Sequence, residues 1–152
     1  MTFCTRSFAF ALGALLLVAC SPSGSGPAPR ATDPLVVTDV PVLLFPSEMM
    51  RTTVVTGEAA WYGLSYSIPG LTVYLHATVN FVDAPSDIAP VETELTVRGV
   101  PALETVNEGI QTVSWVESDA AYALDAECAD AEDTRCTNAE FLINLAERMV
   151  AQ

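Results

Sequence analysis

Alternating apolar and polar positions dominate residues 60–82 and predict a β-hairpin. Apolar side chains recur at every second residue from Tyr62 to Ile68 and again from Leu71 to Phe81, which is the pattern of strands with one buried face. Pro69-Gly70 separates the two runs, and a two-residue loop there pairs Tyr62 with Ala77 and Ile68 with Leu71, so that the apolar partners share one side. Because Pro-Gly suits a type II turn and tight hairpins prefer the primed types, a wider loop is the alternative.

Further strands are predicted on both sides of this hairpin. Leu35 to Phe45 is apolar but contains Pro41, so it is an edge strand or is interrupted there. Val91 to Gly99 alternates again, with Glu92, Glu94, Thr96 and Arg98 on its wet face. Turns at 107–109 and at Ser118-Asp119 then separate strands at 102–106 and 110–117 from a last strand, in which one face is formed by Tyr122, Leu124, Ala126 and Cys128. Connections this short indicate antiparallel pairing.

The periodicity changes near the C-terminal end and predicts one helix. Thr137 followed by Glu140 has the form of a capping box. The apolar stripe that follows consists of Phe141, Leu142, Leu145, Met149 and Val150. The predicted fold class is therefore α+β: a twisted antiparallel sheet of six or seven strands with one C-terminal helix packed on a face, in a single domain over residues 35–152.

The first twenty residues differ from the rest and indicate export. Arg6 precedes an unbroken apolar run from Phe8 to Ala19. As a helix the run spans about 18 Å, too short for a bilayer core of about 30 Å, so a signal peptide is favoured over a membrane-spanning anchor. Leu17-Val18-Ala19-Cys20 resembles a bacterial lipobox. The resemblance implies cleavage before Cys20 and lipid attachment to this cysteine; an ordinary signal peptide with a chance cysteine is the alternative.

The residues after Cys20 fit a tether. In proteins with a lipobox, an aspartate after the cysteine usually retains the protein in the inner membrane, whereas this chain has Ser21. The resemblance therefore implies the outer membrane, on its periplasmic side, if the organism has two membranes. Residues 21–34 contain four Pro, three Ser and two Gly, and a coil of this length spans about 20 Å. The predicted organisation is a signal peptide over 1–19, a lipidated Cys20 with its tether over 20–34, and the domain.

Composition narrows the classes of function. The chain of 152 residues has 19 Asp and Glu against six basic residues, all Arg, and a net charge of -13. Phosphate binding needs clustered basic side chains, so nucleic acid is not a predicted partner. The absence of lysine excludes lysine-based catalysis. A hydrophobic fraction of 51% is too high for a disordered chain.

The cysteines fit an oxidising compartment. Cys4 leaves with the signal peptide and Cys20 takes the lipid, so Cys128 and Cys136 remain as a pair. An even pair in an exported chain predicts a disulfide. A metal or redox pair is the alternative, but the spacing does not fit a CxxC motif and no His lies nearby in the sequence.

Candidate catalytic residues are few. His76 is the only histidine, and on the predicted register it faces Gly63 on the polar side of the sheet. A hydrolase would use it as general base beside Ser65 or Thr78, or would use the carboxylate pair Glu92 and Glu94. No G-x-S-x-G motif is present in the sequence.

Acidic residues are densest just before and within the segment between the two late cysteines. Carboxylates at this density bind Ca²⁺ weakly, but the spacing does not match a calcium loop, and a solvated loop explains them as well. No metal or cofactor is predicted. The residues concerned are Asp125, Glu127, Asp130, Glu132 and Asp133.

Aromatic residues on the hairpin give the best candidate for a functional surface. Tyr62 and Tyr66 fall on one face, and Trp61 and Tyr74 fall on the other beside His76. Such aromatics serve either as core under the helix or as an exposed contact surface. We expect the contact surface at Trp61, Tyr74 and His76.

A second resemblance concerns the late strands. Trp115-Val116-Glu117 followed by Tyr122-Ala123-Leu124 is similar to a W-x-E…Y-x-L hairpin of periplasmic lipoprotein-carrier-like and anti-sigma-associated sheet domains. The resemblance covers about ten residues, implies an extracytoplasmic sheet domain and carries over no functional residue.

Together these features predict a lipid-anchored cell-envelope protein with a non-catalytic binding or structural role near the membrane. Its partners are the membrane, through the lipid on Cys20, and an envelope protein or a small apolar ligand. An envelope hydrolase that uses His76 or a carboxylate pair is the alternative, and a structural lipoprotein without any ligand is a third possibility.

Overall fold

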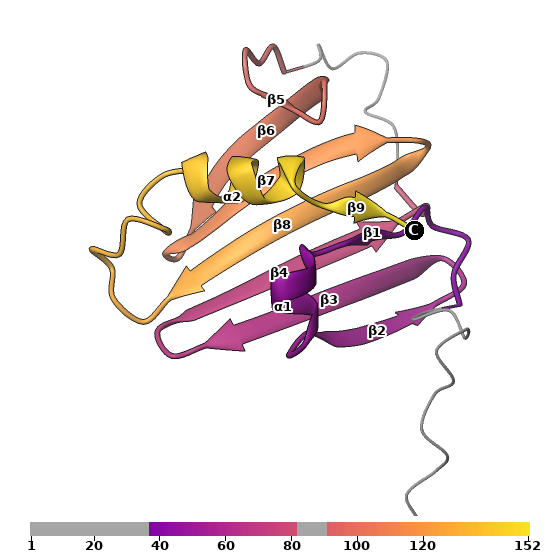
Figure 1. Ribbon diagram of the computed structural model, residues 1–152. Helices are drawn as coiled ribbons and strands as arrows, with labels where there is room; N and C mark the ends of the chain where they lie inside the picture. The colour runs from indigo at the N-terminus through magenta and orange to yellow at the C-terminus, as the bar shows by residue number, and fades with distance from the viewer. Residues whose placement is uncertain (1–36, 82–90) are drawn as a thin grey trace, which may run out of the picture. The chain divides into compact units, whose positions relative to one another are not determined.

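The computed structural model of the protein describes residues 37–81 and 91–152 (Figure 1). The predicted signal peptide, Cys20 and the tether lie outside these residues. All described residues fall within one compact unit, Pro34–Gln152. In this part of the chain, no helix has both the length and the apolar character that crossing a membrane requires.

Seven antiparallel strands form one sheet in the order β2-β3-β4-β8-β7-β6-β5. The strands are β2 (Val54–Glu58), β3 (Trp61–Ile68), β4 (Leu71–Thr78), β5 (Thr96–Val97), β6 (Val100–Asn107), β7 (Ile110–Glu117) and β8 (Ala120–Cys128). Two meanders, β2–β4 and β5–β8, meet at the centre where β4 pairs with β8 (Figure 1). The predicted fold class is confirmed: an antiparallel sheet of seven strands carries a helix on one face.

The register predicted for the first hairpin is also confirmed. β3 and β4 pair Tyr62 with Ala77 and Ile68 with Leu71. The loop is Pro69-Gly70 alone, so the wider loop considered as an alternative is wrong. Gly70 has a φ of 83°, which glycine adopts without the steric cost that a side chain brings.

Three two-residue loops in the second meander have positive φ at both residues, as type I′ hairpin turns require. They lie at Arg98-Gly99, Glu108-Gly109 and Ser118-Asp119. The last two fit the predicted turns. The first does not, because the sequence predicted a strand from Val91 to Gly99; the structure has only Thr96–Val97 in β5, and the chain reverses at Arg98.

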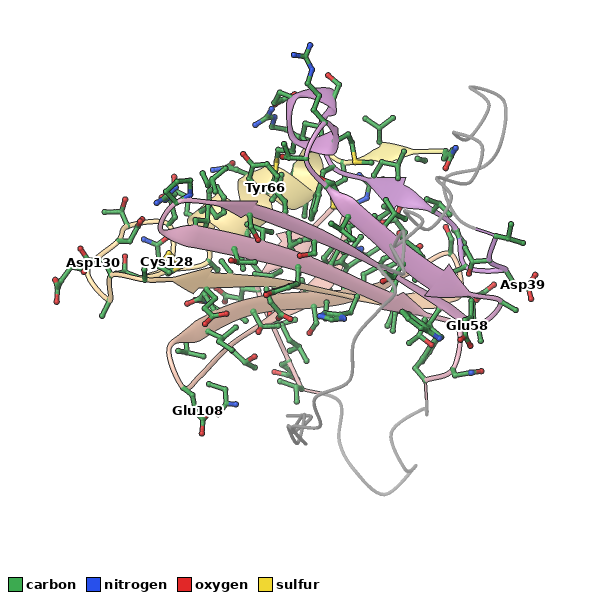
Figure 2. All side chains as sticks on the ribbon, turned by 90° about the horizontal axis from the view of Figure 1, so that it is seen from below. Asp39, Glu58, Tyr66, Glu108, Cys128 and Asp130 are labelled. Carbon is green, nitrogen blue, oxygen red and sulfur yellow. A yellow bond between two sulfur atoms is a disulfide. The ribbon has the colours of Figure 1, made fainter. Side chains whose placement is uncertain are left out.

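A second layer covers one face of the sheet. It consists of β1 (Leu43–Leu44), α1 (Ser47–Met50), α2 (Glu140–Glu147) and β9 (Val150–Ala151), which lie on the same side of the sheet as Tyr66 (Figure 2). β1 pairs with β9 and begins after Pro41, as the interrupted apolar run predicted.

Two tyrosine hydroxyl groups of the sheet form hydrogen bonds with the backbone of the segment that contains β1. The Leu43 N–H donates to the Tyr62 hydroxyl oxygen at 2.7 Å, and this hydroxyl donates to the Leu43 carbonyl oxygen at 3.1 Å. The Tyr122 hydroxyl donates to the Pro41 carbonyl oxygen at 2.7 Å. Because both side chains are buried, these hydrogen bonds satisfy polar groups that would otherwise be costly inside the core.

The core lies between the two layers. Buried side chains of the sheet meet buried side chains of the cover. Within the sheet, the ring of Trp115 on β7 stacks on that of Tyr122 on β8 at a centroid distance of 5.3 Å. Among the largest fully buried side chains are Tyr62, Phe45, Leu64, Leu75, Leu124 and Leu142. Burial of each large apolar side chain stabilises the folded state by about 1.5–3 kcal/mol.

The C-terminal helix differs from its prediction at both ends. Thr137 does not cap it: the Thr137 hydroxyl points to the Thr134 carbonyl, and the Asn138 side-chain oxygen accepts the Glu140 N–H at 2.9 Å. The predicted capping box is therefore wrong. The helix ends at Glu147, so Val150 belongs to β9 rather than to the helical stripe. Leu142 and Leu145 are buried on the helix as expected, and Met149 is buried although it lies after the end of the helix.

Candidate contact surface on the open sheet face

The side of the seven-stranded sheet opposite α2 and β1 is called here the open face. Among the described residues, both helices and the two-stranded sheet lie on the other side (Figure 2). The open face carries the side chains that alternate with the core residues, and cross-strand partners form rows across it. One row contains Trp61, Thr78, Ala121 and Val116, and the next contains Gly63, His76, Ala123, Ser114 and Leu103.

The structure brings the three predicted contact residues together. Trp61, Tyr74 and His76 line one hollow of about 230 Å³, in which Gly63 contributes no side chain. Trp61 is 42% exposed, and the ring of Tyr74 stacks on that of His76 at 6.2 Å. Tyr62, by contrast, is fully buried on the covered face and Tyr66 is partly buried against the core. The hairpin aromatics therefore divide between core and open face as their alternation predicted.

Small residues at the centre of the open face form a second depression. Ser114, Ala121 and Ala123 form its floor, Trp61 stands on one side, and Val116 and Leu103 stand on the other. These six residues are called the apolar hollow. Two adjoining spaces of about 330 and 400 Å³ make up its volume. Val116 is 49% and Leu103 is 40% exposed, so this part of the surface presents apolar side chains to solvent.

A carboxylate lies beside the apolar hollow. Asp125 follows Ala123 by two residues on β8, and its Oδ1 accepts the Thr112 hydroxyl at 2.7 Å. His76 Nε2 lies 3.5 Å from Asp125 Oδ2, and the exposed fractions of the two side chains are 65% and 22%. Asp125 is thus fixed by Thr112 and flanked by an exposed imidazole.

The arrangement around His76 does not support the hydrolase alternative. Opposite His76 is Gly63, whereas Ser65 lies opposite Tyr74. The Thr78 hydroxyl donates to the Ala60 carbonyl oxygen at 3.0 Å. Among the described residues, neither hydroxyl forms a hydrogen bond with His76. The side-chain contact of His76 is instead with Asp125, whose other carboxylate oxygen accepts the Thr112 hydroxyl.

The predicted carboxylate pair is also not arranged as a catalytic site. Glu92 and Glu94 are exposed and precede β5 in a segment without regular structure. Neither residue lines the apolar hollow or the hollow at Trp61, Tyr74 and His76.

The acidic residues of the late segment serve separate local structures. Asp133 Oδ1 accepts from Arg135 Nε at 2.9 Å, and the hydrogen bonds from Arg135 lower the pKa of the Asp133 carboxyl to about 2. Asp130 accepts the Glu132 N–H at 3.0 Å, whereas Asp125 lies on the open face. Across 37–81 and 91–152, no three His, Cys, Asp or Glu side chains gather in a way that could hold a metal ion.

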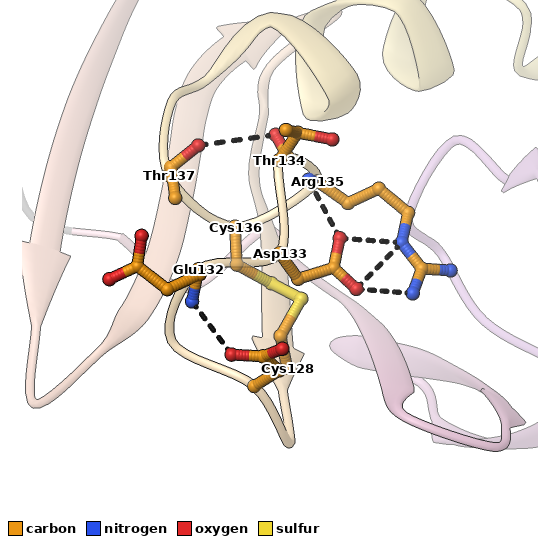
Figure 3. Close-up of a disulfide and its surroundings, with 8 residues drawn as sticks. Cys128, Glu132, Asp133, Thr134, Arg135, Cys136 and Thr137 are labelled. Atoms are coloured by element: carbon orange, nitrogen blue, oxygen red, sulfur yellow. Dashed lines mark hydrogen bonds and ion pairs between the residues drawn. A yellow bond between two sulfur atoms is a disulfide. The ribbon is translucent and has the colours of Figure 1, made fainter.

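Cys128 and Cys136 are joined by a disulfide, as predicted. The bond ties the end of β8 to the segment that leads into α2, and Asp133 with Arg135 lies beside it (Figure 3). The disulfide and the ion pair therefore hold the same connection between sheet and helix.

The residues of the W-x-E…Y-x-L pattern have structural contacts. Trp115 Nε1 donates to Glu117 Oε2 at 3.2 Å, and Arg98 Nε donates to the same oxygen at 2.8 Å. Burial raises the pKa of the Tyr122 hydroxyl to about 12. Sequence reasoning placed Arg98 on a wet strand face and missed this network, because the contacts join residues far apart in the chain.

Comparison of this chain with protein-family models, with curated proteins and with solved structures finds no match.

Proposed function

We propose that this protein is an exported lipoprotein, anchored through a lipid on Cys20, whose open face binds an apolar group of an envelope partner or ligand without catalysis. The binding role rests on the apolar hollow, where Trp61, Val116 and Leu103 surround a floor of small side chains. The anchor rests on the pattern Leu17-Val18-Ala19-Cys20.

Size and chemistry of the hollow suit binding. Its two spaces of about 330 and 400 Å³ fall in the range of ligand sites, which are mostly apolar with a few polar groups at their margin. His76 and Asp125 supply such polar groups here. Exposed apolar clusters with an aromatic anchor are typical of contact surfaces.

The place where the domain joins its predicted tether fits this role. The Asp39 N–H and the Thr38 hydroxyl both donate to the Ala59 carbonyl oxygen, at 2.7 and 3.0 Å. Ala59 belongs to the turn between β2 and β3 and precedes Trp61 by two residues, so Thr38 lies beside this turn. A lipid on Cys20 would hold the domain within reach of the membrane through a flexible tether. We place the protein in the cell envelope, on the periplasmic side of the outer membrane if two membranes are present.

Binding of the neutral apolar dye Nile red to the full mature chain tests the proposal. The chain carries Cys20→Ser so that it is soluble without lipid. We expect the dye fluorescence to rise on binding, and Ala123→Phe, which fills the hollow from its floor, to abolish the rise. The matched control is Thr105→Phe, which adds the same side chain at an exposed position of β6 on the same face. Equal dye binding by the chain with Ala123→Phe and the unsubstituted chain would overturn the proposal.

A further inference from the structure

We infer that the occupant of the open face is a basic polypeptide segment, which lies in extended form along β8 with apolar side chains in the hollow and Lys or Arg side chains over Asp125 and Glu127. The inference rests on the proposed function and adds the chemistry of the partner.

The charged strand residues of the open face are all acidic. Its strand residues include three carboxylates, Glu58, Asp125 and Glu127, and no Arg. The arginines of the described ranges lie elsewhere: Arg98 pairs with Glu117, Arg135 with Asp133 and Arg148 with Glu48, while Arg51 follows α1. The face therefore complements a cationic partner and repels an anionic one.

The order of residues along β8 sets the shape of the partner. Ala121, Ala123, Asp125 and Glu127 occupy alternate positions and point to the open face. Alternate residues of a strand are spaced by about 7 Å. An extended bound segment has the same spacing between its alternate residues. If two of its apolar residues lie above Ala121 and Ala123, its next two alternate residues lie above Asp125 and Glu127. Apolar contact gives affinity in the hollow, and the carboxylates fix the direction of the segment.

The net charge of the chain favours a basic polypeptide over an anionic lipid surface as the partner of the open face. From Cys20 onward the chain has five Arg against nineteen acidic residues, a formal charge of -14. Envelope membranes with anionic lipids repel such a surface, whereas a basic segment is attracted and steered toward it.

Two synthetic peptides test the inference on the full mature chain with Cys20→Ser. One has Leu at alternate positions followed by Lys at alternate positions, and the other has Glu in place of each Lys. Binding is measured by isothermal titration calorimetry. We expect the Lys peptide to bind and the Glu peptide not to bind. The affinity should fall at least tenfold from about 0.1 M to about 1 M salt, because the screening length shortens from about 10 Å to about 3 Å.

Substitutions locate the contact. Asp125→Asn and Glu127→Gln should each weaken binding of the Lys peptide about fivefold, and the amide that Asp125→Asn introduces keeps an oxygen that can accept the Thr112 hydroxyl. The control is Glu140→Gln, which removes the same charge from an exposed residue of α2 on the other side of the sheet and should leave the affinity unchanged. Thermal unfolding shows whether each variant is folded.

Each outcome bears on one of the two proposals. Equal binding of both peptides, or equal loss from Glu140→Gln and Asp125→Asn, would overturn the basic segment. Binding of the chain to phosphatidylcholine vesicles would also overturn the basic segment, if Ala123→Phe abolishes this binding and Asp125→Asn leaves it unchanged. If the dye still binds and Ala123→Phe still blocks it, the proposed apolar contact stands in all three cases.

Discussion

At the scale of single residues, Arg98 joins three elements through one side chain. Its Nε and Nη2 donate to the two carboxylate oxygens of Glu117 at 2.8 and 3.3 Å. Its Nη1 donates to the carbonyl oxygens of Ala146 and Met149, at 3.3 and 3.0 Å. Carbonyl groups at the end of a helix lack intrahelical partners and carry partial negative charge. Arg98 therefore links the turn before β6, the end of β7 and the end of α2.

Removal of this side chain should destabilise the domain. We expect Arg98→Ala to lower the free energy of unfolding by about 2 kcal/mol, because Glu117 and two carbonyl groups lose a half-buried charged partner. Arg98→Lys should recover only part of this loss, since one ammonium cannot replace the planar fork. Urea unfolding measures both, with Arg51→Ala at an exposed position as the control. Equal stability of the unsubstituted chain and the chain with Arg98→Lys would contradict the role given to the fork.

The buried tyrosine hydroxyl groups make stability depend on alkaline pH. Burial raises the pKa of Tyr122 to about 12 and raises that of Tyr62 as well. An unfolded tyrosine has a pKa of about 10. Between these values the folded chain binds more protons than the unfolded chain, so the stabilisation is complete below about pH 10 and is lost as the pH rises through about 12.

Urea unfolding between about pH 9 and about pH 12 checks this dependence, because the range begins below the pKa of an unfolded tyrosine. We expect the free energy of unfolding to fall by about 1.4 kcal/mol per pH unit for each tyrosine concerned. Tyr122→Phe should remove one such contribution and flatten the profile. An equally steep profile in this variant would show that Tyr122 is not the group responsible.

At the scale of elements, local signals decide what the sequence can predict. The register of β3 and β4 follows from alternation on both sides of Pro69-Gly70, because a shift by one residue would turn the apolar set of one strand outward. The turn at Arg98-Gly99 was missed because the flanking residues alternate as one strand would. The pairing of β4 with β8 joins segments more than forty residues apart, and neither strand carries a local signal for it.

The candidate site was predictable only in part. Trp61, Tyr74 and His76 share a polar strand face in the sequence, and the structure groups them around Gly63. Ala121 and Ala123 alternate with Tyr122 and Leu124, so the sequence predicts small residues on the open face of β8. That they form the floor of a hollow depends on β3 and β6, whose side chains reach them only through the order of strands in the sheet.

Capping of α2 gives a prediction at the level of one element. We expect Asn138→Ala to lower the free energy of unfolding by about 1 kcal/mol, because its side-chain oxygen accepts the Glu140 N–H. Thr137→Ala should change it by less than about 0.5 kcal/mol, since Thr137 makes only a long hydrogen bond of 3.5 Å to the Thr134 carbonyl. Thermal or urea unfolding distinguishes the two. A larger loss from Thr137→Ala would restore the capping box.

At the scale of the whole molecule, the two sides of the sheet have different roles. The covered side holds the core, the two tyrosine hydroxyl bridges and the disulfide-linked approach to α2. The open side presents the apolar hollow and its acidic margin. Residues 38 and 39 meet the sheet at the end where Trp61 lies. The proposed function assigns stability to the covered side and binding to the open side.

The proposed anchor at Cys20 is the central claim of the proposed function, and intact mass of the protein extracted from membranes tests it most directly. We expect the mass of residues 20–152 plus acyl chains, with an increase by two hydrogen atoms on reduction of the single disulfide. An unlipidated mass, or one that retains residues 1–19, would contradict the account. The domain would then have no lipid that holds it at a membrane.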